Sequence, residues 1–214
     1  MRAKEAAAIA SGTVTGLELM ERAGQGAAEA IAAQWPEARA ALILCGPGNN
    51  CGDGYVVARL LDARGWRVAV CAAREAAALP PDAAAQALRC AGLPTRAWSA
   101  EAVADLLTTG DGPILVVDAL LGIGQARDCS ELLAPWWQAL ALSSGTGRDR
   151  DIHTVSLDVP TGLCSDSGAL LARAPFEPEL VVTFHAEKPV HQMLRNSGVR
   201  VVVADIGLPH EERE

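Results

Sequence analysis

A glycine-rich segment between an apolar run and an amphipathic run most strongly constrains the fold of this chain. Residues 41–45 (ALILC) are apolar, residues 46–54 (GPGNNCGDG) follow, and residues 55–64 have the spacing of an amphipathic helix. A strand, a glycine-rich turn and a helix in this order can form an anion site, because the first amides of the helix and its dipole point toward the bound charge. The segment therefore predicts a βα unit with a ligand site at its turn.

The spacing of the glycines does not match the best-known nucleotide loops. A P-loop ends in Gly-Lys-Ser/Thr, and the fingerprint G-x-G-x-x-G fails because Cys51 stands at the position of its third glycine. The spacing G-x-x-x-G-x-G occurs in short-chain dehydrogenases, but the Tyr-x-x-x-Lys pair of those enzymes is missing. A glycine-rich turn can also simply connect a strand to a helix. Asn49, Asn50 and Asp53 add polar side chains that a connection does not need, so we favour binding.

Composition limits the possible partners of the chain. Half of the 214 residues are hydrophobic and 21% are charged, which allows a sizeable core. The net charge of −8 argues against binding to nucleic acid or to anionic membranes. No apolar run approaches the roughly 20 residues that span a bilayer. The six cysteines form no C-x-x-C pair, which indicates reduced thiols and a cytoplasmic protein.

Apolar runs and helical patterns alternate along the chain. We expect further strands at residues 66–72, 96–98, 113–117, 153–157, 180–184 and 199–204. We expect helices at residues 2–10, after a capping box at Thr15 and Glu18, from 80 to 90, from 99 to 107, and around 133–140 with Pro135 near the first turn. A polar linker is expected at residues 143–150. The alternation predicts one α/β domain, residues 1–214, with a mainly parallel sheet covered on both faces.

Polar residues follow four of the expected strands. Ligands of open α/β sheets bind at the carboxyl ends of the strands, and this rule brings together residues 49–53, 117–124, 157–162 and 183–189. Asp118 and Asp158 each come directly after a buried strand, where a carboxylate needs a partner. Each could instead cap its own loop through backbone bonds. Two aspartates at equivalent edges favour a shared site.

The side chains in these segments suit a cation and a negatively charged ligand. Asn50, Asp118 and Thr161 could supply amide, carboxylate and hydroxyl oxygens to a hard cation. Lys188 could contact a phosphate or act as an acid, although most lysines are simply solvated. His185 is as easily explained by structure as by catalysis.

Taken together, the segments resemble the YjeF N-terminal-domain family, the NAD(P)H-hydrate epimerases. The likeness includes residues 19–24 (LMERAG), the loop from Gly48 to Gly54, residues 117–122 (VDALLG), residues 158–162 (DVPTG) and the segment from Phe184 to Pro189. The resemblance implies a three-layer αβα Rossmann-like fold, often a homodimer, and interconversion of the R and S forms of hydrated NADH and NADPH.

The resemblance also implies roles for individual residues. By position, it implies a dinucleotide site of Asn49, Asn50, Cys51, Gly52 and Asp53, a phosphate site of Gly122, Ile123, Gly124, Gln125, Ala126, Arg127 and Asp128, a substrate contact at Asp158, and a potassium site of Asn50, Asp118 and Thr161. Cys51 stands where relatives usually have glycine, which puts the shape of the loop in question. Thr161 stands where they commonly have serine, which keeps the hydroxyl group.

A mechanism follows as a hypothesis. The reacting carbon bears a ring nitrogen and a hydroxyl, so loss of water gives a planar iminium to which water can return on either face. Ring opening and reclosure is an alternative route. Both need an acid/base group and a site that tolerates positive charge, and we assign Asp158 as base and cation stabiliser and Lys188 as acid or phosphate contact.

Other functions are compatible with the same motifs. Relatives of this domain also resemble non-catalytic binding modules, and the retained Asn50, Asp118 and Asp158 favour the enzyme. An ordinary NAD-dependent dehydrogenase is disfavoured by the missing fingerprint. The resemblance further implies a fused or separate ADP- or ATP-dependent dehydratase as partner.

Overall fold

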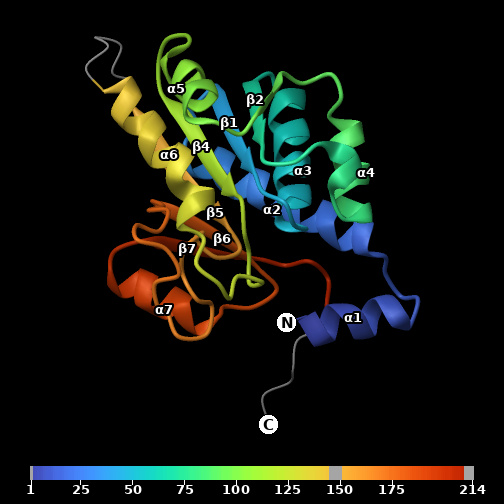
Figure 1. Ribbon diagram of the computed structural model, residues 1–214. Helices are drawn as coiled ribbons and strands as arrows, with labels where there is room; N and C mark the ends of the chain where they lie inside the picture. Colours follow the sequence, from blue (N-terminus) through green and yellow to red (C-terminus); the bar gives the residue numbers. More distant parts are fainter. Residues whose placement is uncertain (1, 145–150, 210–214) are drawn as a thin grey trace.

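A seven-stranded sheet forms the centre of the computed structural model, which describes residues 2–144 and 151–209. Every neighbouring pair of strands is parallel (Figure 1). The strands are β1 (Ala40–Cys45), β2 (Arg67–Ala72), β3 (Thr95–Ala97), β4 (Ile114–Ala119), β5 (Ile152–Leu157), β6 (Leu180–Phe184) and β7 (Arg200–Ala204). The apolar runs of the central strands are buried on both faces, which explains why their sequences do not alternate.

The order of the strands places a crevice at one point of the sheet. The order is β3-β2-β1-β4-β5-β6-β7, so the chain first winds away from β1 in one direction and then returns to continue from its other side. The carboxyl ends of β1 and β4, which pair directly, therefore lie where the winding direction reverses. Ligands of open α/β sheets bind at such a point.

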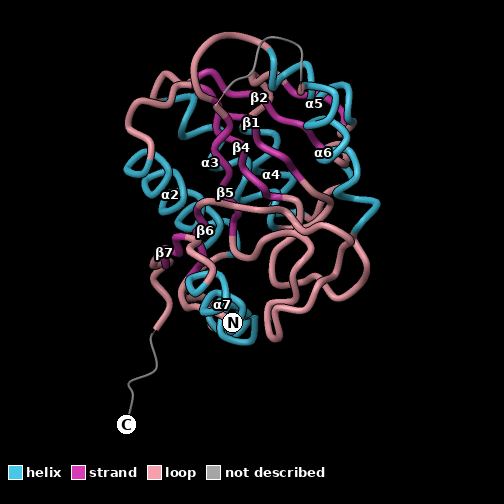
Figure 2. The backbone as a smooth tube through the Cα atoms, turned by 90° about the vertical axis from the view of Figure 1, so that its left-hand side faces the viewer, coloured by secondary structure: helices cyan, strands magenta, loops and turns pink. Residues whose placement is uncertain are grey.

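Helices cover both faces of the sheet (Figures 1 and 2). The helices are α1 (Arg2–Ala10), α2 (Gly16–Gln34), α3 (Asn50–Ala63), a short 3-10 helix (Ala76–Ala78), α4 (Pro81–Arg89), α5 (Ala100–Thr108), α6 (Ser130–Ser143) and α7 (Pro189–Asn196). α2, α3 and α4 pack over one hydrophobic cluster, and α5 and α6 pack over a second on the opposite face. The three-layer αβα fold predicted from the sequence is confirmed.

The start of α3 differs from the expectation. The helix begins at Asn50, so residues 50–54 form its first turns and only residues 46–49 form a loop. The glycines serve packing here. A Cβ on Gly52 would lie 2.3 Å from the Met20 sulfur, and a Cβ on Gly54 would lie 2.6 Å from the Ala119 Cβ. These two glycines therefore bring α3 close to α2 and to β4.

Two other elements also differ from the expectation. Pro135 lies inside α6 rather than near its first turn, and the helix continues past it because Leu133, Trp136 and Ala139 are buried against the sheet. α7 was not expected, and it begins with Pro189 at a position that proline favours. Of the expected linker at 143–150, residues 145–150 lie outside the described residues.

None of the helices among residues 2–144 and 151–209 has both the length and the apolar character that crossing a membrane requires.

Candidate active site

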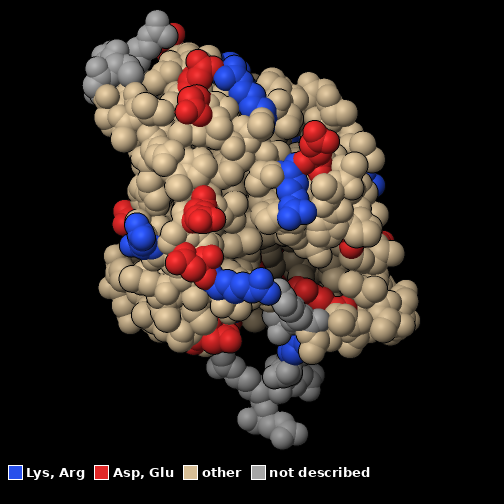
Figure 3. Space-filling view, in the orientation of Figure 1, with Lys and Arg blue, Asp and Glu red and all other residues tan. Residues whose placement is uncertain are grey.

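A cavity of about 540 Å³ opens at the carboxyl ends of β1, β4, β5 and β6. Figure 3 shows a hollow in this face above α1, with acidic side chains at its edge. The lining residues are Glu5, Gly48, Asn49, Asn50, Asp53, Leu120, Leu121, Gly122, Ile123, Gly124, Asp158 and Phe184. All four segments that the sequence analysis placed together contribute to this cavity.

The first segment divides between the cavity and the core. Asn49, Asn50 and Asp53 line the cavity at the start of α3. Cys51 and Gly52 lie on the buried side of the same helix turn. Burial raises the pKa of the Cys51 thiol to about 12, so this thiol stays protonated. Cys51 thus fills core space beneath the loop, and the structure brings it no activating partner among the described residues.

The second segment also divides. Gly122, Ile123 and Gly124 line the cavity. The buried side chain of Gln125 joins two loops, since its Nε2 donates to the Pro160 carbonyl at 3.0 Å and its Oε1 accepts from the Gly162 amide at 2.7 Å. The remaining expected residues lie further along: Ala126, Arg127 and Asp128 are exposed, and Asp128 lines a separate cavity with Trp137 and Arg173.

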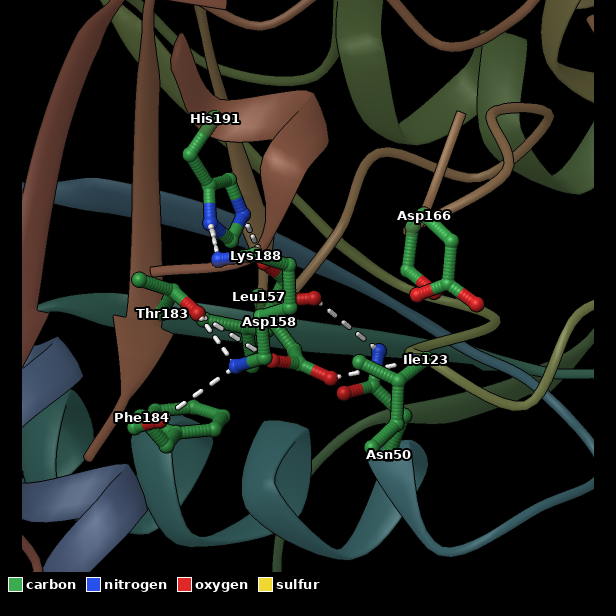
Figure 4. Close-up of polar contacts among 10 residues, drawn as sticks. Asn50, Ile123, Leu157, Asp158, Asp166, Thr183, Phe184, Lys188 and His191 are labelled. Carbon is green, nitrogen blue, oxygen red and sulfur yellow. Dashed lines mark hydrogen bonds and ion pairs between the residues drawn. The ribbon is translucent and has the colours of Figure 1, made fainter. Parts of the chain in front are cut away.

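Asp158 presents its two carboxylate oxygens to different surroundings (Figure 4). Oδ1 accepts from the Lys188 ammonium at 2.6 Å and from the Thr183 hydroxyl at 3.2 Å. Among the described residues, Oδ2 accepts from the Ile123 amide alone, at 3.0 Å, on the side that faces the cavity. Asp158 follows β5 with φ +66°, a left-handed conformation that a non-glycine residue adopts only when its surroundings hold it there.

Lys188 is a buried partner of Asp158 rather than a surface lysine. Its side chain is 9% exposed. The ammonium group donates to Asp158 Oδ1 and Thr183 Oγ1, each at 2.6 Å, and to the Phe184 carbonyl at 3.3 Å. These three acceptors use its three protons, and Lys188 lies behind Asp158 as seen from the cavity lining.

Gly122 lets two oxygens approach the main chain of its loop. A Cβ at this position would lie 3.0 Å from Asp158 Oδ2 and 3.2 Å from Asn50 Oδ1. Both oxygens therefore converge on the same face of Gly122. A larger residue would displace one of them.

Asp118 is fully buried and ties together the loops behind the cavity. Its carboxylate accepts from the Ser156 hydroxyl at 3.0 Å, the Leu120 amide at 3.1 Å, and the amide and hydroxyl of Thr161 at 2.9 and 2.7 Å. Burial raises the pKa of Asp118 to about 6, although these four donors act against the rise. No basic side chain pairs with it in the described part of the chain.

The residues predicted to hold a cation carry the kinds of oxygen that a hard cation prefers. Asp118 supplies a buried carboxylate, Thr161 supplies a hydroxyl oxygen, and Asn50 lines the cavity with an amide oxygen that accepts from no donor among the described residues. Within residues 2–144 and 151–209, no three His, Cys, Asp or Glu side chains cluster as metal ligands.

The cavity has an acidic lining. Glu5, Asp53 and Asp158 line it, and no lysine or arginine is among its described lining residues. Burial raises the pKa of Asp53 well above its usual range, and the charges of Asp158 and Glu5 add to the rise. The cavity thus gathers several carboxyl groups, one of which, that of Asp158, is paired to Lys188, and such a lining suits proton transfer and a developing positive charge.

Sequence reasoning missed two residues at this site. Glu5 reaches the cavity from α1, and nothing in its local sequence indicates such a contact. His191 is fully buried, its Nε2 donates to the Asp158 carbonyl at 2.7 Å, and its Nδ1 accepts from the Lys188 amide at 2.9 Å. His191 is the third residue of α7, three residues after the capping residue Lys188. Side chains at this position often reach back to the cap, so the position was a usable signal.

Known proteins that resemble this chain agree with the fold and the motifs. The crystal structure of the yeast protein YNL200c superposes with a TM-score of 0.77 at 22% identity, covering 94% of this chain and 84% of that one. Proteins named NAD(P)H-hydrate epimerase from Cereibacter sphaeroides and Rhodobacter capsulatus are 51% and 46% identical to it, each over 97% of this chain and over 99% and 96% of their own lengths. A protein from Coxiella burnetii named bifunctional NAD(P)H-hydrate repair enzyme Nnr is 37% identical over 88% of this chain and 36% of its own length.

A family model described as YjeF-related protein N-terminus matches residues 16–190. The match spans the cavity segments that follow β1, β4, β5 and β6. The resemblance predicted from the sequence is confirmed, and the chain belongs to the family of YjeF-related N-terminal domains.

Proposed function

We propose that this protein is an NAD(P)H-hydrate epimerase, an isomerase that interconverts the R and S forms of hydrated NADH and NADPH. The observation that carries the proposal is Asp158, whose Oδ2 faces the cavity while its Oδ1 is held by Lys188 and Thr183. A carboxylate fixed on one side and open on the other can exchange a proton with a bound ligand. The names of relatives that match nearly the whole chain support the substrate.

In the proposed reaction, the two carboxyl groups at the cavity have different tasks. We assign Asp53, whose pKa burial raises, as the acid. Its carboxyl group gives a proton to the hydroxyl group of the hydrate, and water leaves as the ring nitrogen donates its electron pair to the carbon. The planar iminium then receives water from the other face, and Asp158 Oδ2 accepts the proton that this water loses. In the reverse direction the two carboxyl groups exchange these tasks. Before another turnover in the same direction, Asp158 releases its proton to water and Asp53 takes one up. The acidic lining of Glu5, Asp53 and Asp158 stabilises the positive charge of the iminium.

Lys188 supports this chemistry from behind the cavity. It neutralises Asp158 and fixes Oδ1 at 2.6 Å, so that Oδ2 is the oxygen that meets the substrate. In this proposal Lys188 acts as the partner of the base, and its three protein acceptors leave it no proton for a phosphate.

The rest of the dinucleotide extends along the loop after β4. Gly122, Ile123 and Gly124 line the cavity, and the exposed residues Ala126, Arg127 and Asp128 continue the loop toward the N-terminus of α6. Main-chain amides along a glycine-containing loop suit pyrophosphate. We propose this path for the phosphates, with the nicotinamide end against Asn49, Asn50 and Asp53.

Potassium is the cation that we propose for the oxygen set behind the cavity. Asn50, Asp118 and Thr161 would hold it. A bound cation would supply fixed positive charge beside Asp118, between the start of α3 at Asn50 and the loop that carries Thr161. The proposal extends to a homodimer in the cytoplasm, where six free thiols stay reduced. We also propose an ADP- or ATP-dependent NAD(P)H-hydrate dehydratase, fused or separate, as partner, which the name of the bifunctional relative supports.

The test is proton NMR or chromatography of purified R-hydrate of NADPH in potassium buffer, with and without the protein. We expect equilibration to the S form well above the spontaneous rate. A folded protein that does not accelerate it would contradict the epimerase and leave a non-catalytic binding module as the better reading of the same cavity.

A further inference from the structure

We propose that His191 is a positioning residue that fixes Asp158 and Lys188 relative to each other through their main chains. This inference rests on the proposed function, because it assigns a new residue to the same site. His191 lies on α7, is fully buried and does not line the cavity. It therefore acts on the substrate only through the two residues that it contacts.

The two ring nitrogens of His191 contact the two residues of the ion pair. Nδ1 lies 2.9 Å from the amide nitrogen of Lys188, and Nε2 lies 2.7 Å from the carbonyl oxygen of Asp158 (Figure 4). The side chains of the same two residues are joined at 2.6 Å. Asp158 and Lys188 are thus connected twice, once by their side chains and once through the imidazole ring.

The partners determine the protonation of the ring. An amide N–H can only donate, so Nδ1 accepts and carries no proton. A carbonyl oxygen can only accept, so Nε2 carries the proton and donates it. Burial lowers the pKa of His191, which agrees with a neutral ring. Only the neutral ring with a proton on Nε2 satisfies both contacts.

The contact with Asp158 bears on the conformation of its main chain. Asp158 has φ +66°, and its carbonyl, which this conformation turns toward α7, accepts from His191. The same turn directs the Asp158 side chain so that Oδ2 meets the Ile123 amide and the cavity. Without the donor at Nε2, the strained conformation loses a hydrogen bond that holds it, and Oδ2 loses its fixed position.

The contact with Lys188 fixes the other half of the pair. Lys188 is the residue that caps α7, and His191 is the third residue of that helix. In a capping box, a glutamine or glutamate at this position reaches back to the amide of the cap. Histidine does so here and has a second nitrogen left to reach Asp158.

This geometry allows a matched pair of substitutions. Glutamine at position 191 has an oxygen that can accept from the Lys188 amide and a nitrogen that can donate to the Asp158 carbonyl. Glutamate has nearly the same shape but offers no donor when ionised. We expect His191→Gln to retain most of the wild-type kcat, and His191→Glu to lose about 100-fold, the size of effect that small misplacements of catalytic groups cause.

A third variant removes both contacts without adding charge. His191→Leu should lower kcat as much as His191→Glu while KM stays near that of the wild type, because the cavity lining does not include residue 191. His153→Gln is the control. His153 lies near the start of β5, away from the cavity, and its ring stacks on that of Trp35. We expect it to leave kcat unchanged. Circular dichroism and thermal melting check that each variant is folded.

Imidazole ¹⁵N NMR of the wild type tests the geometry independently of enzymatic activity. The chain has four histidines, and the signals that disappear in His191→Gln belong to His191. We expect a neutral ring with the proton on Nε2 at pH 7. A folded His191→Leu protein with wild-type kcat, or a ring with the proton on Nδ1, would overturn the inference. An inactive wild type with the expected tautomer would overturn the epimerase and leave the connection between Asp158 and Lys188 in place.

Discussion

At the scale of single residues, the two oxygens of Asp158 explain why one carboxylate can be both anchored and reactive. Oδ1 accepts hydrogen bonds from Lys188 and Thr183, and Oδ2 can still accept a proton or a hydrogen bond from a ligand in the cavity. An amide cannot replace it. Its nitrogen would face either the Lys188 ammonium or the Ile123 amide, both of which donate.

We therefore expect Asp158→Asn to lower kcat by about 10²- to 10⁴-fold, the usual contribution of a general acid or base. The change in shape is small, so the protein should stay folded. Asp166→Asn is the control, because Asp166 is exposed on the loop that follows the same segment. The measurement is the rate of epimerisation of the R-hydrate by NMR. Equal rates for both variants and the wild type would contradict the role of Asp158.

Gly122 gives a second prediction at this scale. The Cβ of Gly122→Ala would press on Asp158 Oδ2 at 3.0 Å and on Asn50 Oδ1 at 3.2 Å, so a shift of a few tenths of an ångström is forced on the site. We expect a clear loss of kcat with little change in melting temperature. Gly48→Ala is the matched control on the same cavity, because a Cβ there has open space. Equal activity of the two variants would show that the two oxygens tolerate displacement.

At the scale of helices and strands, local chemistry sets where α2 begins. Thr15 Oγ1 accepts from the Glu18 amide at 3.1 Å, and Glu18 Oε2 accepts from the Thr15 amide at 2.7 Å. Thr15→Ala removes one half of this box and should lower the free energy of unfolding by about 1 kcal/mol. Urea unfolding measures it, with Thr95→Ala on exposed β3 as the control. An unchanged midpoint for Thr15→Ala would mean that packing alone holds the start of the helix.

Local signals of this kind explain how much of the fold could be predicted from the sequence. The apolar runs of β1, β4 and β6 were predicted, because burial on both faces leaves a direct trace in the sequence. The polar residues near the ends of these strands and of β5 were predicted as well. The start of α3 was not, because Gly52 and Gly54 resemble a loop until their contacts with Met20 and Ala119 are known.

The same limit applies to the site. Asn50, Asp118, Asp158 and Thr161 could be found because they lie at or after the carboxyl ends of strands. The contact of Glu5 with the cavity depends on where α1 lies, and the task of Lys188 depends on Thr183 and Phe184 behind it. Such long-range contacts have no local pattern. His191 shows the intermediate case, in which a capping position gave a hint but not the second partner.

At the scale of the whole molecule, the thiols differ in accessibility. Five of the six free cysteines are buried, and Cys164 is the exception. Hydrogen bonds from Ser167 and the neighbouring main chain lower the pKa of Cys164. Its thiolate therefore persists to lower pH than that of an ordinary thiol. We expect iodoacetamide to label Cys164 first in the folded protein, and to keep doing so as the pH falls below 8. Peptide mass spectrometry measures the labelling rate of each cysteine, with Cys164→Ser as control. A buried cysteine that reacted as fast as Cys164 would contradict this expectation.

Cation binding should also appear in the stability of the whole molecule. A ligand that binds only the folded state raises the melting temperature. We expect a higher melting temperature in potassium chloride than in tetramethylammonium chloride at the same ionic strength, because the larger cation does not fit among Asn50, Asp118 and Thr161. The difference should shrink in Asn50→Ala. Equal melting temperatures of the wild type in the two salts would contradict a potassium site.

The arrangement of the strands has a consequence for how the protein reaches its active state. The cavity needs the ends of β1, β4, β5 and β6, whose residues span positions 45 to 184 and pair only in parallel. Parallel pairing over such separations is slow, because a long loop must close before each pair forms. During refolding, helical signal should return before catalysis does. The rate at which epimerisation recovers would then report the last step of folding. A protein with a native circular dichroism spectrum could still lack activity.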